Sequence, residues 1–388
     1  MKQLLRRFSS KARVFRINQK VRTKPTGFVG FQDFDLSRDG SISLETLAQN
    51  PHISLYALNH LSREAIFVET PPDVDLAERP FLYQAQYENA TRLYSLSYRS
   101  FLKLAGMVRQ PVKPLIFIHS VGRCGSTLLS NVFNNQPDIL SLSEPDAFTG
   151  LVMQRERNGR NDAQIIQLIN AIIQLQCRPT PHLNPQAYVI KFRSFSTVLI
   201  DLLHQAAPHA KHIFLYRNAE DQARSIARAF KAVEAGREAL DTVALHERTK
   251  FLPLLSQYAN RARQGDLSEV EMNMLGWLSG LQSYLDQHAA GVPMCAVRYE
   301  EMINQPEPIV RALFEYCRLP VTPERLALGV KAFERDSQQG SSLARTNLKQ
   351  DQQNQLTAEH LAQIHQLLAE HPTIKTADFI VPNTIQPN

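Results

Sequence analysis

The chain has 388 residues, of which 43% are hydrophobic and 21% are charged, so it is long enough to bury a large α/β core without a disulfide or a metal. Its four cysteines form no CxxC pair, which argues against a disulfide framework or a zinc site and favours a reducing, cytoplasmic location. No uninterrupted apolar run reaches the roughly 18 to 20 residues that a transmembrane helix needs.

The net charge of +6 is concentrated at the N-terminus. Residues 1–24 contain nine basic residues and no acidic one, which leaves 34 basic and 37 acidic side chains in the rest of the chain. The body of the protein is therefore not expected to bind nucleic acid through its charge. Apolar residues recur at helical spacing in this basic amphipathic tail. It is expected to be a membrane-surface helix, an organelle presequence or a solvated terminus, and a peripheral contact with a membrane or a partner protein is one role it suggests.

Residues 25–110 are predicted to form an N-terminal α+β subdomain. The stretch "ISLYALNHLSREAIFVET" at 53–70 alternates in the manner of two strands around a turn. Four tyrosines fall on one face of a helix predicted to follow it: Tyr83, Tyr87, Tyr94 and Tyr98. Such a stripe is more typical of a packing surface than of an acceptor pocket.

Residues 111–388 are predicted to form a second, larger domain. Five short apolar or β-branched runs are typical of buried strands: 114–119, 138–142, 188–192, 212–217 and 294–299. Stretches with helical periodicity separate them, and this alternation predicts an α/β fold with a parallel sheet of about five strands flanked by helices. In such sheets ligands bind beyond the carboxyl ends of the strands.

The segment "SVGRCGSTLL" at 120–129 joins the first of these strands to a helix. Compared with the phosphate-loop pattern GxxxxGK followed by Ser or Thr, it retains Gly125 and Thr127, but Ser126 replaces the lysine. Backbone N–H groups at the helix start would face an anion, and Arg123 supplies a positive charge. Because the missing lysine normally stabilises γ-phosphoryl transfer, a kinase-like phosphotransferase is the less favoured alternative, and another phosphate-linked donor is expected.

A second anion-binding pattern lies in "HIFLYRNAEDQARSIARAF" at 212–230. Arg217 falls at the end of a predicted strand, and Ser225 follows eight residues later on the next helix. An arginine offers a forked, charge-assisted contact to a phosphate, and the serine adds a hydroxyl. Arg224 and Arg228 are candidates to assist them.

These two motifs resemble the donor site of the sulfotransferases. "GRCGSTLL" is similar to the family's loop for the 5′-phosphosulfate, with Cys124 where serine is common, and the Arg–Ser pair is similar to the motif for the 3′-phosphate. The resemblance extends over about 112–350. It implies a P-loop type of α/β fold and transfer of a sulfuryl group, without a metal, from 3′-phosphoadenosine 5′-phosphosulfate (PAPS) to a hydroxyl or amine. The acceptor would be a small molecule, a glycan or a peptide.

The resemblance also implies which residues bind the donor. The positions that it assigns are Arg123, Cys124, Gly125, Ser126, Thr127, Leu128, Arg217 and Ser225. Ser342 and Arg345, in "SQQGSSLARTNL", match a loop that closes over the donor in family members.

Sulfuryl transfer needs a base for the acceptor's proton and cations for the charge on the transferring group. Glu144, 21 positions after Arg123, is the candidate base, because family branches with a glutamate base have it at a similar distance. Asp146 is a poorer rival, and His119 is kept as an alternative because other branches use histidine.

Lys191 resembles the family's lysine near the reacting centre, where it would act together with Arg123. Arg193 is an alternative to Lys191 in this role. A non-catalytic nucleotide-binding module, recruited through the basic tail, is the remaining alternative for the whole chain, and the acid–base residue beside the donor motifs argues against it.

Overall fold

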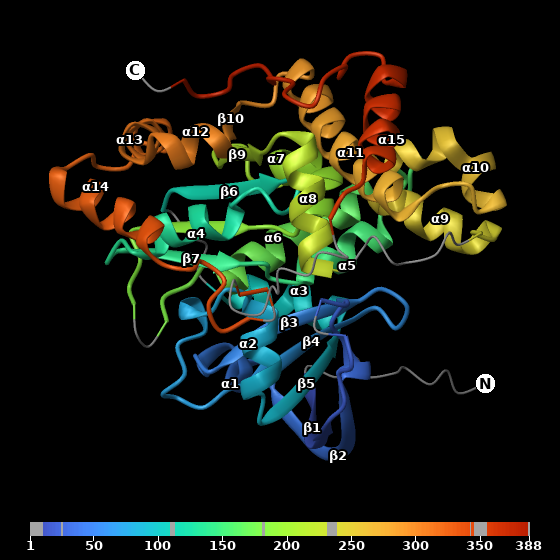
Figure 1. The fold of residues 1–388 in the computed structure, drawn as a ribbon. Coiled ribbons are helices and arrows are strands. Elements are labelled where there is room, and N and C mark those ends of the chain that lie inside the picture. Colours follow the sequence, from blue (N-terminus) through green and yellow to red (C-terminus); the bar gives the residue numbers. More distant parts are fainter. Residues whose placement is uncertain are drawn as a thin grey trace. The chain divides into compact units, whose positions relative to one another are not determined.

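The computed structural model describes residues 11–24, 26–108, 113–180, 183–230, 239–341, 343–344 and 355–386. The chain forms two compact units, one built on an antiparallel sheet and the other on a parallel sheet (Figure 1). None of the helices in these ranges combines the length and apolarity required to span a membrane.

The first unit comprises Met1–Val112 and Pro145–Pro185, with strands in the order β2-β1-β5-β4-β3. The strands are β1 (Lys11–Lys20), β2 (Phe34–Ser43), β3 (Ile53–Asn59), β4 (Glu64–Glu69) and β5 (Arg92–Ser97). The helices are α1 (Leu44–Gln49), α2 (Leu82–Asn89), α3 (Tyr98–Met107), α5 (Ala147–Gln154) and α6 (Asp162–Gln176), with short 3-10 helices η1 (Phe31–Asp33) and η2 (Leu76–Glu78). The predicted pair of strands within 53–70 is confirmed by the antiparallel β3–β4 hairpin.

The N-terminal segment differs from its prediction. Residues 11–20 form strand β1, so the helical or solvated tail expected over 1–24 is wrong for this part of it, and residues 1–10 lie outside the described residues. β1 pairs with β2 on one side and β5 on the other, and Ala12 and Val14 are buried. Pairing with two neighbouring strands outweighs a local helical spacing of apolar residues, because tertiary context overrides propensity.

The tyrosine stripe does not lie on one helix. Tyr83 and Tyr87 belong to α2, Tyr94 lies in β5, and Tyr98 begins α3. β5 pairs with β1 and β4, so hydrogen bonding to two strands interrupts the expected helix. Tyr83, Tyr94 and Tyr98 are buried, as expected for packing residues.

The division into units also differs from the predicted boundary at 110/111. The segment Pro145–Pro185, which carries α5 and α6 between two strands of the parallel sheet, belongs to the first unit. Gly150 of α5 packs tightly on Leu58 of β3, where an added Cβ would lie 2.5 Å from the Leu58 carbonyl oxygen. The chain thus leaves the second unit at Glu144 and returns to it at Gln186.

The second unit, Lys113–Glu144 and Gln186–Asn388, contains a parallel sheet in the order β10-β9-β6-β8-β7. The strands are β6 (Leu115–Ser120), β7 (Ile139–Ser143), β8 (Ala187–Lys191), β9 (Lys211–Tyr216) and β10 (Met294–Arg298), so all five predicted strands and the predicted α/β class are confirmed.

In chain order, the helices of the second unit are α4 (Ser126–Asn134), η3 (Ser194–Leu199), α7 (Ile200–Ala206), α8 (Ala219–Phe230), α9 (Thr242–Phe251), η4 (Pro253–Tyr258), α10 (Ala259–Gln264), α11 (Glu269–Ala289), α12 (Tyr299–Asn304), α13 (Pro306–Tyr316), α14 (Pro323–Val330), η5 (Lys331–Glu334) and α15 (Ala358–Glu370). One buried apolar cluster joins the β6 side chains Ile116 and Ile118 to Leu129 and Val132 of α4. It fixes α4 on the sheet and thereby the loop that precedes α4.

The register of the parallel strands aligns their carboxyl ends. Ser120 of β6 is paired with Leu215 of β9, and Lys191 of β8 is paired with both Ile118 of β6 and Ser143 of β7. The connections after β6, β7, β8 and β9 therefore leave the sheet at one edge, where an α/β sheet binds its ligand.

Candidate active site

The β6–α4 loop has the backbone geometry of an anion-binding turn. Gly122, Arg123 and Gly125 have positive φ angles of 77°, 52° and 83°, and the first described turn of α4 closes with a 3.0 Å hydrogen bond from Leu129 N–H to the Gly125 carbonyl. A Cβ on Gly125 would lie 2.6 Å from the Tyr299 ring, so both conformation and space require glycine there. The start of α4 presents N–H groups that an anion can accept.

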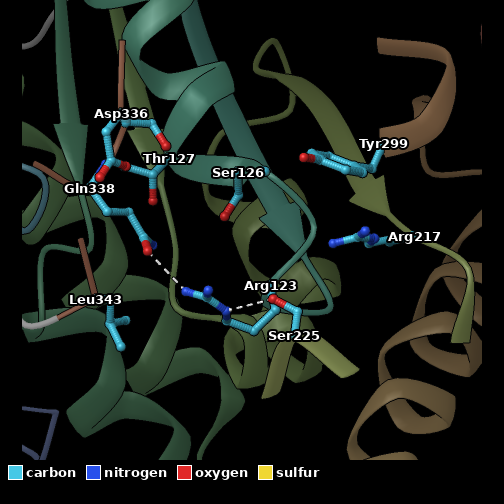
Figure 2. A pocket seen from close by; sticks show the side chains of 11 residues that line it. Arg123, Ser126, Thr127, Arg217, Ser225, Tyr299, Asp336, Gln338 and Leu343 are labelled. Atoms are coloured by element: carbon cyan, nitrogen blue, oxygen red, sulfur yellow. Dashed lines mark hydrogen bonds between the residues drawn. The ribbon is translucent and has the colours of Figure 1, made fainter. Parts of the chain in front are cut away.

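A cavity of about 130 Å³ lies beside this loop (Figure 2). It is lined by Arg123, Gly125, Ser126, Thr127, Arg217, Ser225, Tyr299, Asp336, Ser337, Gln338 and Leu343. The cavity brings the two sequence motifs together, although they are separated by about ninety residues. Within the described ranges, no group of three or more His, Cys, Asp or Glu side chains is arranged to hold a metal ion.

Arg123 connects the two motifs directly. Its Nε donates to Ser225 Oγ at 3.2 Å, and its Nη1 donates to Gln338 Oε1 at 2.9 Å, as the dashed lines in Figure 2 show. Burial lowers the pKa of Arg123, and the nearby charges of Arg228 and Arg217 lower it further. An arginine remains charged in proteins, so the guanidinium groups of Arg123 and Arg217 at this cavity favour a bound anion.

Arg217 follows β9, and both its side chain and its backbone contact an aromatic residue. Its guanidinium carbon lies 4.5 Å from the centre of the Tyr299 ring, and its carbonyl accepts a 2.9 Å hydrogen bond from Trp277 Nε1. The nearest carboxylates, of Asp221 and Glu300, are each 3.8 Å away, beyond hydrogen-bond distance. The buried Nε of Arg217 has no hydrogen-bond partner among the described residues, so a ligand anion could satisfy it.

The two candidate assisting arginines on α8 differ in their surroundings. Arg224 forms ion pairs of 2.8 Å with Glu220 and 3.1 Å with Asp221. Arg228 acts electrostatically on Arg123. Of the two, Arg228 is therefore the one whose charge acts on a residue of the cavity.

Cys124 and Leu128 lie within the loop and α4 but do not line the cavity. Cys124 is fully buried, its Sγ donates to the Leu215 carbonyl at 3.3 Å, and burial raises the pKa of the thiol to about 11. The thiol therefore stays protonated and is not a reactive nucleophile. Leu128 belongs to the apolar core. Ser342 and Arg345 lie outside the described residues.

Glu144 and Lys191 meet at the carboxyl ends of β7 and β8. The Glu144 N–H donates to the Lys191 carbonyl at 2.7 Å, and its carboxylate forms an ion pair with the Lys191 ammonium. Arg193 Nε lies 3.8 Å from the other carboxylate oxygen. Against the larger effect of burial, the charge of Lys191 acts to lower the pKa of Cys124 in the loop. Neither Glu144 nor Lys191 lines the cavity itself.

The alternative base His119 lies inside the core of the second unit. Its ring is fully buried, stacked at 5.1 Å on Phe192 and at 5.3 Å on His212, and Nε2 lies 3.1 Å from His212 Nδ1. Burial lowers the pKa of His119 well below its ordinary range. A neutral imidazole inside the core cannot reach an acceptor's proton.

Asp146 is also occupied, in the first unit. Its carboxylate accepts 3.0 Å and 2.7 Å hydrogen bonds from the Val29 N–H and the Thr149 hydroxyl, and the side chain is buried. These contacts tie the start of α5 to the backbone at Val29. Asp146 is therefore a structural residue, which leaves Glu144 as the candidate base.

Sequence reasoning assigned no role to five cavity residues: Tyr299, Asp336, Ser337, Gln338 and Leu343. Tyr299 is the last residue of the strand predicted at 294–299, so its place at the ligand-binding edge could have been noticed. Asp336 follows η5 and carries no such signal, whereas Ser337, Gln338 and Leu343 lie in the segment "SQQGSSLARTNL", which resembles a loop that closes over the donor.

Comparisons with known proteins identify the family to which the chain belongs. Among solved structures, the chain is similar to the mouse sulfotransferase SULT7A1 complexed with PAP (16% identity, TM-score 0.37, 70% of this chain and 88% of that chain). It is also similar to the sulfotransferase domain from the curacin biosynthetic pathway (17%, TM-score 0.38, 68% and 100%) and to sulfotransferase STF9 from Mycobacterium avium (14%, TM-score 0.38, 69% and 79%). No curated protein matches the sequence. The model of the sulfotransferase family matches residues 114–323, more than half of the chain, and the chain therefore belongs to the sulfotransferase family.

Proposed function

We propose that the protein transfers a sulfuryl group from PAPS to a hydroxyl or amine acceptor. One observation carries this proposal: Arg123 of the loop donates to Ser225 of the second motif, so the two anion-binding motifs form one site. PAPS has a 3′-phosphate and a 5′-phosphosulfate, which need two such motifs within the length of one nucleotide. ATP has no 3′-phosphate to occupy the second motif.

The residues divide between the two anionic groups of the donor. Arg217 and Ser225 bind the 3′-phosphate, with support from the charge of Arg228. The N–H groups at Ser126 and Thr127, at the start of α4, bind the 5′-phosphosulfate. Arg123 exchanges its contact with the neutral Gln338 amide for a stronger, charge-assisted hydrogen bond to the donor.

The transfer end of the site supplies a base and a cation. The acceptor oxygen or nitrogen attacks the sulfur, the bond between sulfur and the phosphate oxygen breaks, and Glu144 takes the acceptor's proton. The electron pair of the broken bond remains on the phosphate oxygen, where the Lys191 ammonium stabilises the new charge. The products are the sulfated acceptor and adenosine 3′,5′-bisphosphate. The ion pair with Lys191 holds the Glu144 carboxylate at the loop edge of the sheet.

A thermal-shift titration in EDTA tests donor recognition without an acceptor. Adenosine 3′,5′-bisphosphate at 100 times its dissociation constant should stabilise the fold by about 2.7 kcal/mol. Stabilisation by ATP with magnesium in a parallel titration without EDTA, but not by the bisphosphate, would replace the sulfotransferase proposal with a kinase. Incubation with sulfur-labelled PAPS and a panel of metabolites, glycans and peptides then tests transfer itself.

A further inference from the structure

Ser143, the last residue of β7, has a buried hydroxyl. The residue is 6% exposed, and its Oγ has no hydrogen-bond partner among the described residues. A buried hydroxyl that makes no hydrogen bond costs free energy, so such a group in a native structure calls for an explanation. A ligand could satisfy this hydroxyl if the hydroxyl lies near the start of α4.

The register of the sheet shows which way the side chain points. Ser143 is paired with Lys191 on the neighbouring parallel strand, so the two side chains leave the sheet on the same face. Ser141, two residues earlier on β7, lies on this face too, and its Oγ is 2.8 Å from Ser130 Oγ of α4. The hydroxyl of Ser143 therefore lies on the face that α4 covers.

The geometry of strand and helix places Ser143 near the start of α4. The helix returns from the carboxyl end of β6 to the amino end of β7, so it runs opposite to β7. Two residues along a strand span about 6.6 Å, and four residues along a helix span about 6 Å. If Ser141 faces Ser130, then Ser143 faces Ser126, whose side chain lines the cavity.

We infer that the Ser143 hydroxyl donates a hydrogen bond to a sulfuryl oxygen of the donor held at the start of α4. This inference rests on the proposed function. It gives the transferring group a neutral hydrogen-bond donor on the face that carries Lys191 and directly before Glu144 in the chain. An oxygen of the sulfuryl group would satisfy the hydroxyl, which the described part of the chain leaves without a partner.

Ligand binding to the whole chain tests the inference without an acceptor. Dissociation constants for PAPS and for adenosine 3′,5′-bisphosphate are measured in the wild type and in Ser143→Ala. The bisphosphate has no sulfuryl group, so its affinity should change less than about twofold, whereas PAPS should bind roughly tenfold more weakly. Ser143→Cys, which replaces the hydroxyl with a weak donor of similar size, should show the same selective loss.

Ser141→Ala is the matched control, because this serine lies on the same strand and face but already contacts Ser130. It should lower thermal stability and leave the ratio of the two dissociation constants unchanged. Equal affinity changes for both ligands in the Ser143 variants, or no change, would overturn the inference and leave the proposed function intact. A wild-type protein that binds neither ligand would overturn the proposed function, and the inference with it.

Discussion

The cationic side chains at the two ends of the site have different partners. At the cavity end, formed by Arg123, Arg217 and Ser225, Arg123 donates to neutral side chains, and the carboxylates nearest to Arg217 are 3.8 Å away. At the transfer end, formed by Glu144, Lys191 and Arg193, Lys191 is already ion-paired with Glu144. Positive charge that is not directly hydrogen-bonded to a carboxylate is suited to hold an anionic ligand. In the pair at the transfer end, the carboxylate is suited to take a proton, and the ammonium is suited to stabilise negative charge.

Glu144→Gln is expected to have the largest effect, because it removes the base and leaves the cavity end intact. Glutamine keeps the volume but cannot take a proton, so turnover should fall by roughly 10²- to 10⁴-fold. Affinity for adenosine 3′,5′-bisphosphate should stay nearly unchanged. Steady-state kinetics on an identified acceptor, together with calorimetric binding of the bisphosphate, measures both quantities.

Glu300→Gln is the matched control for this substitution. Glu300 lies 3.8 Å from Arg217 at the cavity end and accepts a 3.1 Å hydrogen bond from the Asn218 N–H. Its replacement should retain most turnover. Wild-type turnover in Glu144→Gln would remove Glu144 from the mechanism and erase the distinction between the two ends.

Arg217→Ala should act in the opposite way and weaken donor binding by about 2 to 3 kcal/mol, or roughly 30- to 150-fold. The lost contact is with the 3′-phosphate, so turnover at saturating donor should fall less than affinity does. Arg224→Ala is the control, because Arg224 is already paired with Glu220 and Asp221. Comparable losses in both variants, measured by calorimetry, would mean that the general charge of α8 binds the donor rather than Arg217.

Gly125→Ala tests the packing that joins the loop to the cavity end, with an expected loss of stability of about 2 kcal/mol. The substitution strains a backbone with φ of 83° and drives a methyl group into the Tyr299 ring, on which Arg217 is stacked. Gly291→Ala has nearly the same φ, 85°, but open space around its Cβ, so it isolates the backbone strain. Equal losses in chemical denaturation would show that the contact with Tyr299 does not matter.

The sequence was most informative about the features that depend on neighbouring residues. The five buried runs, the glycine turn and the spacing from Arg217 to Ser225 are all local features. The runs form the parallel sheet as predicted, and residues of the glycine turn line one cavity together with Arg217 and Ser225. Arg123 was assigned to the loop and to catalysis. Its contacts with Ser225 and Gln338 could not be read from spacing, because those partners lie 102 and 215 residues away.

The failures have a common physical cause, which is long-range pairing. The helical spacing in the N-terminal segment and in the tyrosine stripe is genuine, but β1 and β5 lie inside a sheet and hydrogen-bond to strands on both sides. His119 was retained as an alternative base because other branches of the family use histidine. In the fold its side chain points to the opposite face from Lys191, toward Phe192 and His212.

The buried histidines give the smallest prediction, a fall in stability as the pH is lowered. Burial, with a contribution from the charge of His204, lowers the pKa of His212 to about 3. Between pH 6.5 and pH 3 the unfolded chain binds a proton at this residue and the folded chain does not, so unfolding becomes easier as the pH falls. From pH 7 to pH 5.5 the expected loss is about 1 kcal/mol for His212 alone.

His212→Leu should flatten this pH dependence of stability, since it removes the residue that the unfolded chain protonates. His209→Gln, at an exposed position nearby in the sequence, should leave the dependence as it is in the wild type. Chemical denaturation at a series of pH values measures the slope in each protein. Because His119 stacks on His212 at the base of the loop, acid should weaken the fold beneath the cavity end and lower bisphosphate binding along with stability. A slope that is the same in His212→Leu and the wild type would show that other groups set the acid sensitivity, and that the loop does not depend on a neutral histidine pair.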